Sequence, residues 1–429
     1  MITEYSPTIP IATSSCDVSK FPETVALRAR VTQLGIHNSA WPLGRITNGP
    51  NVATASINGR MCANFAGYNY LGLAQHPSVL DAAHAAIDAY GASASASRIA
   101  SGNMDPHLEL EAAIARWLGV EAALVFPAGH FTNLVGISSL VRQGSDIIFM
   151  DALVHNSIVL GARLAGAQAY SFPHNNLRML DGMLKQHRSR YDRALIITEG
   201  VFSADGDLPD LATLVDLARS HDAMIMIDEA HSLGVVGSTG RGVGEAMGID
   251  RSAVTVWMGT LSKALASCGG YIAGSHELIH LLRYTNGGFM FSAGMPPANA
   301  GAALAALHVL EQEPQRVQAV QRNANLFRLL ARKAGLSIGS SVAPSPVVPI
   351  MVGDDEATIQ LCNDLYMAGI NVGPMLSPAV PHGKSRLRFF LTSDHTEEQI
   401  HNTVAAVARR LIRVEIPTVV FETNLVQAG

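Results

Sequence analysis

The stretch Ala223-Met224-Ile225-Met226-Ile227-Asp228-Glu229-Ala230-His231 decides the fold of this chain. Its apolar run predicts a buried strand, and an acid stands directly at the end of that run. A second apolar run, residues 254–258, ends in Gly259-Thr260-Leu261-Ser262-Lys263. In an open α/β sheet, ligands bind just beyond the carboxyl ends of the strands. We therefore expect both motifs to face one crevice.

Strand-like and helix-like segments alternate through the middle of the chain. Helices are expected at residues 76–90 and 107–118 and from Phe131 onward, with further helices between the strands. The predicted strands are residues 122–126, 146–150, 193–198, 223–227 and 254–258. This alternation predicts an α/β fold in which helices cover both faces of a mostly parallel central sheet.

The pattern changes on either side of this region. We divide the chain into an N-terminal arm with a small-domain segment (residues 1–60), a large α/β domain (61–300) and a smaller C-terminal α+β domain (301–429). Predicted elements outside the large domain are a helix at 23–34, a hairpin turning at Asn58-Gly59, a long Ala-rich helix at 297–311, strands at 347–352 and 386–391, and helices at 355–368 and 396–410. Thr396 and Gln399 have the spacing of a capping box.

Composition narrows the class of protein. The chain has 429 residues, of which 48% are hydrophobic and 15% charged, with a net charge of −5. This favours a folded enzyme and gives no basic footprint for nucleic acid. Four cysteines lack metal-ligand spacing, so we expect no metal site and reduced thiols in a cytoplasm. The N-terminus lacks the pattern of a signal peptide, and no apolar run reaches the ~18 residues of a membrane span.

The residue types in the two motifs indicate a cofactor. A lysine, an acid and hydroxyls are the groups that hold pyridoxal phosphate (PLP). Lys263 would form a Schiff base, Asp228 would keep the pyridine nitrogen protonated, and hydroxyls such as those of Thr260 and Ser262 would bind the phosphate. Other interpretations stay open, because Asp is also a common helix N-cap and a lysine after a strand is often a surface residue.

Three further segments could contribute to such a site. Gly129 and His130 lie where a strand turns into a helix, which suits a phosphate, although glycine turns are common. His155 follows another strand and would stack on a pyridine ring or pack in the interior; His231 would donate to the phenolic oxygen of the cofactor or pack likewise. The glycines of residues 237–244 do not form a dinucleotide fingerprint, which disfavours a nicotinamide dehydrogenase.

Over roughly residues 60–410 the chain resembles the α-oxoamine synthases, a family of fold-type I PLP-dependent enzymes. The motifs that carry the resemblance occur in order along the chain. They are Asn69-Tyr70-Leu71-Gly72-Leu73, residues 97–102, His107 with Leu110-Glu111, residues 199–207, Asp228-Glu229-Ala230-His231-Ser232-Leu233-Gly234, Thr260-Leu261-Ser262-Lys263, residues 291–297 and Arg386-Leu387-Arg388.

The resemblance implies a role for each matching residue. Lys263 would be the Schiff-base lysine, Asp228 would pair with the ring nitrogen, and His155 would stack on the ring. The remaining positions would surround the cofactor or the substrate: His231 and Ser203 near the phenolic oxygen; Gly129, His130, Thr260 and Ser262 at the phosphate, with Ser292 from a dimer partner; and Asn69 and Arg388 at the amino-acid carboxylate, with Ser97 near the α-carbon substituent.

The resemblance also implies the reaction. An amino acid would condense with an acyl thioester, carried on CoA or a carrier protein, to give an α-amino ketone and CO2. The active site would be shared within a homodimer. The chain departs from several relatives at His130 and at the Ser/Ala-rich run before Arg98, which looks most like synthase modules associated with polyketide assembly.

Two alternatives remain within the same fold. One is an aminotransferase or decarboxylase that retains Lys263 and Asp228. The other is a non-catalytic partner subunit, which is disfavoured because such a subunit would be expected to lose its lysine.

Overall fold

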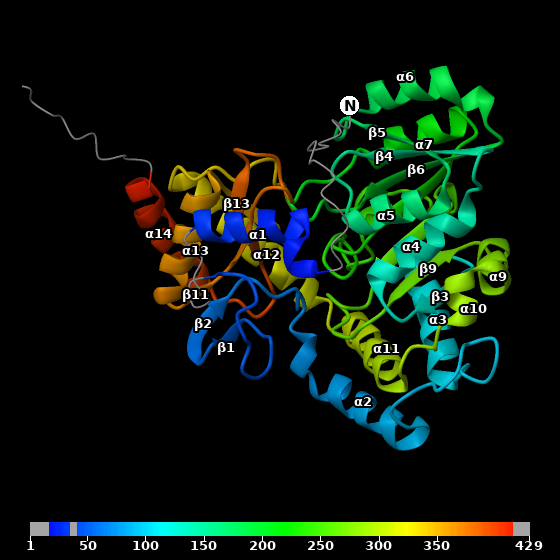
Figure 1. The fold of residues 1–429 in the computed structure, drawn as a ribbon. Coiled ribbons are helices and arrows are strands. Elements are labelled where there is room, and N and C mark those ends of the chain that lie inside the picture. Colours follow the sequence, from blue (N-terminus) through cyan, green and yellow to red (C-terminus); the bar gives the residue numbers. More distant parts are fainter. Residues whose placement is uncertain (1–16, 35–40, 415–429) are drawn as a thin grey trace, which may run out of the picture.

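The larger part of the molecule is built around a seven-stranded sheet (Figure 1). The computed structural model describes residues 17–34 and 41–414. Along the sheet the strands follow the order β3-β9-β8-β7-β6-β4-β5. Their bounds are β3 Ala122–Phe126, β4 Asp146–Asp151, β5 Gln168–Phe172, β6 Arg193–Glu199, β7 Met224–Asp228, β8 Val256–Thr260 and β9 Gly270–Gly274.

Most strand pairs in this sheet are parallel, as predicted. The pairs β4–β5, β4–β6, β6–β7 and β7–β8 are parallel, whereas β9 is antiparallel to both β3 and β8. The register sets Glu199 beside Asp228 and Asp228 beside Met258. The acid of the central motif therefore lies at the carboxyl edge of the sheet, next to a second acid.

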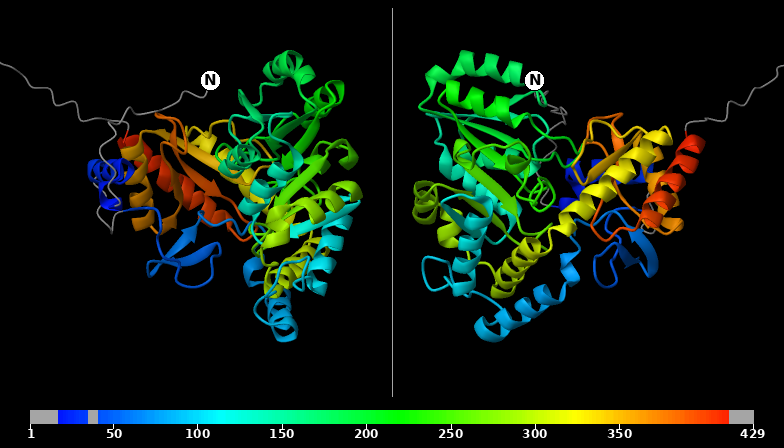
Figure 2. Two further views of the ribbon diagram at one scale, coloured as in Figure 1. Left: turned by 45° about the vertical axis from the view of Figure 1, so that its right-hand side comes forward. Right: turned by 180° about the vertical axis from the view of Figure 1, so that it is seen from behind.

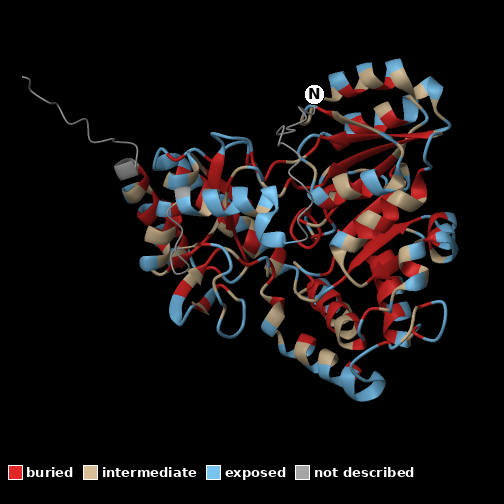
Figure 3. Ribbon diagram, in the orientation of Figure 1, coloured by how far each residue is buried: buried red, intermediate tan, exposed pale blue. Residues whose placement is uncertain are grey.

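Two apolar layers cover the two faces of the sheet. One packs strand residues such as Phe149 and Ile196 against helices α3 (Asp105–Leu118), α6 (Leu177–His187), α7 (Leu211–Ser220) and α11 (Pro297–Gln312). The other packs alternate residues such as Ile148 against α4 (Gly129–Leu140), α5 (Asn156–Ala165), α9 (His276–Thr285) and α10 (Gly287–Phe291). Figure 3 shows the inner strands of this sheet coloured as buried, whereas the edge strand β5 is only partly buried. The predicted fold class is confirmed.

A smaller part of the molecule contains two three-stranded sheets. The first has the order β1-β2-β11 and the second β10-β13-β12. The strands are β1 Thr54–Ile57, β2 Arg60–Asn64, β10 Val347–Gly353, β11 Ile370–Asn371, β12 Gly373–Met375 and β13 Ser385–Phe390. Helices α12 (Gln315–Lys333), α13 (Asp355–Met367) and α14 (Glu397–Val414) pack with them around Phe65, Phe327 and Phe389.

Local predictions in this part are confirmed. Asn58 and Gly59 turn the β1–β2 hairpin with φ angles of 46° and 78°, a region that Asn and Gly tolerate. Thr396 and Gln399 exchange the two hydrogen bonds of a capping box, at 2.9 and 3.1 Å. The remaining helices are α1 Pro22–Gln33, α2 Pro77–Tyr90 and α8 Val243–Ala246.

Helices α11 and α12 connect the two parts of the molecule (Figure 2). Ala300 and Leu307 of α11 belong to the core of the large part, as do Val317 and Val320 at the start of α12. Phe327, later in α12, belongs to the small core. The domain division at residue 300 stays a prediction, and this packing favours a boundary within α12. Among residues 17–34 and 41–414, no helix has the length and apolarity to cross a membrane.

Removing a large core side chain should destabilise the sheet strongly. Phe149 is fully buried on β4. Phe149→Ala should lower the free energy of unfolding by about 3–5 kcal/mol, because it leaves a cavity that the rigid strands cannot fill. Ile196→Val on the neighbouring strand is the control and should cost only about 0.5–1.5 kcal/mol. Urea unfolding measures both, and equal losses would show that the Phe149 site can collapse.

Candidate active site

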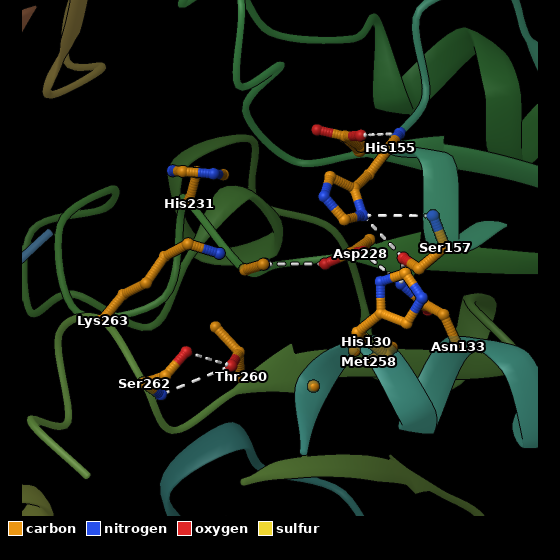
Figure 4. Close-up of a pocket in the computed structure, with 13 residues that line it drawn as sticks. His130, Asn133, His155, Ser157, Asp228, His231, Met258, Thr260, Ser262 and Lys263 are labelled. Carbon is orange, nitrogen blue, oxygen red and sulfur yellow. Dashed lines mark hydrogen bonds between the residues drawn. The ribbon is translucent and has the colours of Figure 1, made fainter. Parts of the chain in front are cut away.

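A cavity opens at the carboxyl edge of the large sheet (Figure 4). Its walls come from the first turn of α4, the loop after β4, the ends of β6, β7 and β8, and the loops that follow β7 and β8. Eight residues predicted for the site line it: Gly129, His130, His155, Asp228, His231, Thr260, Ser262 and Lys263. The other lining residues are Asn133, Ser157, Glu199, Ala230 and Met258.

Asp228 is a buried carboxylate held by hydrogen bonds from both sides. Its Oδ2 accepts from the Asn133 Nδ2 at 2.8 Å, and its Oδ1 accepts from the Ala230 backbone N–H at 2.9 Å. Asn133 also donates to the Ser157 hydroxyl at 2.9 Å. The next helix, α8, begins only at Val243. Asp228 is therefore not a helix N-cap, and its carboxylate lines the cavity.

Lys263 reaches into the cavity from the loop after β8. Figure 4 shows its side chain extending toward Asp228, between His231 on one side and Thr260 and Ser262 on the other. Burial lowers the pKa of the ammonium, and the nearby carboxylates of Asp228 and Glu199 oppose that change only in part. A lysine of lowered pKa loses its proton more readily, which suits a nucleophile or a base.

Glu199 ends β6 as Asp228 ends β7. Its carboxylate accepts a hydrogen bond from the backbone N–H of His155. Burial, and then the neighbouring Asp228, raise the pKa of Glu199 well above its usual range. The ring of His155 is exposed, its Nδ1 lies 2.7 Å from the Ser157 hydroxyl, and the His130 ring meets it edge-on at 6.0 Å. The turn bonded to Glu199 therefore presents the His155 ring to the cavity.

A hydrogen bond to a tyrosine fixes the ring of His231. The hydroxyl of Tyr70 lies 2.7 Å from its Nδ1, and the ring of Phe390 lies parallel to the imidazole at 6.0 Å. Burial, and then the positive charge of Lys263, lower the pKa of His231 well below its usual range. A neutral imidazole is therefore held beside the lysine, with Nδ1 engaged by Tyr70.

The start of α4 and the loop after β8 form an anion cradle. Ala128, at the N-cap of the 12-residue helix α4, makes no side-chain capping bond. A side chain at Gly129 would place its Cβ 2.6 Å from the Thr260 Oγ1, so only glycine fits there. The hydroxyls of Thr260 and Ser262 lie 2.8 Å apart. A helix N-terminus with adjacent hydroxyls suits a phosphate group.

These groups fit PLP. The cradle matches its phosphate, the buried Asp228 matches a protonated ring nitrogen, and Lys263 matches its aldehyde. In the described part of the chain, no group of His, Cys, Asp and Glu is arranged to hold a metal ion.

Five predicted site residues lie outside this cavity, namely Asn69, Ser97, Ser203, Ser292 and Arg388. Arg388 lines a neighbouring cavity of about 280 Å³ together with Tyr68, and its Nη1 donates to the Ser203 carbonyl at 3.0 Å. The Asn69 Oδ1 accepts from the backbone N–H of Ala74. Ser97 and Ser292 belong to two segments that lie side by side. Ser97 forms a β-bridge with Ala293, the neighbour of Ser292.

Sequence reasoning missed Asn133, Glu199 and Tyr70 as site groups. Glu199 had a usable signal, because it ends an apolar strand as Asp228 does. Tyr70 stood within a motif of the resemblance without a role. Asn133 is recognised only by its contact with Asp228, which lies 95 residues away in the chain.

The fold and the site together define a PLP-binding enzyme, and comparison with known proteins identifies its family. Residues 60–407 match aminotransferase class I and II. The 8-amino-7-oxononanoate synthase of Symbiobacterium thermophilum is 40% identical over 360 residues, which cover 84% of this chain and 91% of that protein. The chain therefore belongs to the aminotransferase class I and II family.

Solved structures agree with this assignment. Serine palmitoyltransferase from S. paucimobilis with bound PLP and myriocin has a TM-score of 0.87 and 29% identity, covering 93% of this chain and 99% of that chain. The 8-amino-7-oxononanoate synthase from Francisella tularensis has a TM-score of 0.72 and 26% identity, covering 83% and 99%. The protein is a PLP-dependent α-oxoamine synthase, which condenses an amino acid with an acyl thioester and releases CO2. The predicted family, cofactor and reaction class are confirmed.

Replacing Lys263 should abolish most of the turnover. We expect Lys263→Ala to lower kcat by about 10²–10⁴-fold, the usual contribution of a positioned acid–base group. The variant should still hold PLP noncovalently through the cradle and Asp228. Lys185→Ala, at an exposed lysine on α6, is the control and should keep wild-type kcat. Steady-state kinetics and PLP content measure this, and unimpaired turnover of Lys263→Ala would refute its role.

Proposed function

We propose the following roles in the condensation. Lys263 carries PLP and, when released from it, takes the α-proton of the amino acid. Asp228 faces the ring nitrogen and His155 the ring, while the cradle formed by Gly129, His130, Thr260 and Ser262 holds the phosphate. When bound, PLP withdraws electrons from the α-carbon of the amino acid. The observation that carries this proposal is the single cavity containing Lys263, the buried Asp228 and the uncapped start of α4.

The electrostatics of the cavity support these roles. Burial lowers the pKa of Lys263, so the amine can accept a proton after it leaves the cofactor. His231 is neutral and held by Tyr70, which lets it donate a hydrogen bond to the phenolic oxygen or to the oxygen of the attacked thioester carbonyl. Neither role requires a second positive charge beside Lys263.

The amino-acid carboxylate has two candidate arginines on β13. Arg386 pairs with Asp205 and also donates to the Lys384 carbonyl. Arg388 makes one bond, to the Ser203 carbonyl, and faces a cavity beside Tyr68. A guanidinium matches a carboxylate through two parallel hydrogen bonds. We therefore assign the carboxylate to Arg388, with the side-chain amide of Asn69 as a second donor.

The two arginines can be separated by substitution. We expect Arg388→Lys to raise KM for the amino acid by about 10–100-fold, because an ammonium cannot reproduce the two-pronged contact. Arg386→Lys is the matched control, two residues away on the same strand, and should change KM much less. If Arg386→Lys raises KM and Arg388→Lys does not, the carboxylate binds the other arginine.

We propose that the amino acid is larger than glycine. The small side chain of Ser97 supports this, because by resemblance the position approaches the α-carbon substituent. One methyl group changes such a pocket by about 1–3 kcal/mol.

The substrate can be identified with a panel of glycine, alanine and serine, each with short and long acyl thioesters on CoA and on a carrier protein. Mass detection of the amino ketone should show product with alanine or serine. Product with glycine alone would contradict the size proposal. Conversion of the amino acid to its keto acid without thioester consumption would instead indicate an aminotransferase.

We propose that two copies of the chain share the active site. Phe291 is 83% exposed beside Ser292, and the adjacent loop exposes Ile99. The loop with Ser97 is bridged to this segment at Ala293, so one partner surface would present Ser97 and Ser292 together.

We also propose a cytoplasmic location, supported by the free thiols of Cys62, Cys268 and Cys362.

Disrupting this surface should separate the copies. Light scattering of the wild-type protein should give twice the chain mass, and Phe291→Asp should shift it toward the monomer and lower activity in parallel. Tyr284→Asp, at another exposed aromatic residue on α9, is the comparison that tests whether the effect is confined to the 291–297 segment. A fully active monomer would contradict the shared site.

A further inference from the structure

Two loops that present proposed site residues are joined by a histidine outside the cavity. His174 follows β5, and its two ring nitrogens contact one carboxylate each. Nδ1 lies 2.9 Å from the Asp151 Oδ1, and Nε2 lies 2.8 Å from the Asp207 Oδ2. Asp151 ends β4, and Asp207 closes the loop after β6. The imidazole therefore bridges Asp151 and Asp207, which are 56 residues apart in the sequence.

The bridge requires a charged ring. A carboxylate accepts hydrogen bonds, so both nitrogens of His174 must donate, and both donate only in the imidazolium form. Burial disfavours that form, but the bonds to Asp151 and Asp207 outweigh it and raise the pKa of His174 to about 10. Both carboxylates are buried, so the imidazolium is the cation that compensates them.

Asp151 organises the turn that leads to His155. Its Oδ1 also accepts from the Leu153 backbone N–H at 2.8 Å, and its Oδ2 accepts from the Asn175 backbone N–H at 2.8 Å. The turn thus leaves β4 in a fixed direction, and His155 follows at its end.

Asp207 closes the loop after β6 through its backbone. Its carbonyl accepts from the Phe202 N–H at 3.0 Å, which closes the loop around Ser203. The Ser203 carbonyl accepts from Arg388, and Asp205 in the same loop pairs with Arg386. This loop therefore contacts both arginines of β13.

We propose that His174 is a positioning residue, which holds the His155 turn and the Ser203–Arg388 loop in register by bridging Asp151 and Asp207. The inference rests on the proposed roles of His155 and Arg388. Without the bridge, two buried carboxylates face each other uncompensated, and the two loops separate. His174 does not line the cavity and takes no part in the chemistry itself.

The first test measures loop order in the PLP-free full chain, independently of activity. His174→Gln keeps a polar side chain but removes the cation. Hydrogen–deuterium exchange should rise in peptides covering 151–158 and 199–209 and stay unchanged elsewhere. His221→Gln is the matched control, because His221 makes a similar 2.9 Å pair with Asp181, between α6 and the end of α7. Unchanged exchange in either loop, or the same increase in the control, would overturn the proposal.

The second test measures amino-acid binding to the PLP-loaded protein without any thioester. Titration of the visible absorption band should give a dissociation constant about 10-fold higher for His174→Gln, because the arginine is displaced. The control should bind as the wild type does. Equal binding by both variants would overturn the proposal. If His174→Gln does not fold, Asp207→Asn removes one arm of the bridge and takes its place in both tests.

Wild-type kinetics distinguish this inference from the proposed function. If the wild type forms no amino ketone, the proposed function fails, whereas the exchange and binding comparisons still decide the role of His174.

Discussion

A buried carboxylate at the end of β7 is the constraint on which the site depends. Burying a charge without partners is strongly unfavourable. Asn133 and the Ala230 N–H satisfy the two oxygens of Asp228, and Lys263 supplies a nearby positive charge. Asn133 belongs to α4, which packs on the sheet, and Ala230 and Lys263 lie two and three residues beyond the ends of β7 and β8. The site is therefore preorganised by the same sheet that forms the core.

The parts of the fold that were predicted follow from hydrophobic burial. Strands β3, β4, β6, β7 and β8 are continuous apolar runs because helices cover both faces of the sheet. Two strands of the large sheet were missed for physical reasons, and the short strands β11 and β12 of the smaller part were also missed. The edge strand β5 is only partly buried and includes Gln168 and Ser171, and β9 begins and ends with glycine. The antiparallel direction of β9 depends on its pairing with β3 and β8. No pattern within the sequence of β9 indicates this pairing.

The candidate site divides in a similar way. Asp228 could be predicted because it directly follows an apolar run, and Lys263 because it ends the Thr260-Leu261-Ser262-Lys263 motif that follows another apolar run. Asn133, Tyr70 and His174 could not be derived from the residues, because their roles depend on contacts between distant segments. Ser97 and Ser292 lie outside the cavity of one chain, and their proposed roles depend on the proposed second copy. The β6 loop adds a further connection, since it links the cofactor cavity to the arginines of the smaller sheet.

The central claim is that this one cavity holds PLP through Lys263. Borohydride reduction of the PLP-loaded protein, followed by proteolysis and mass spectrometry, tests it most directly. We expect a reduced pyridoxyl group on the peptide that contains Lys263, in an amount equal to the bound cofactor. A protein that carries the modification at another lysine, or binds PLP without any reducible link, would contradict the account. The other lysines of the chain are Lys20, Lys185, Lys333 and Lys384.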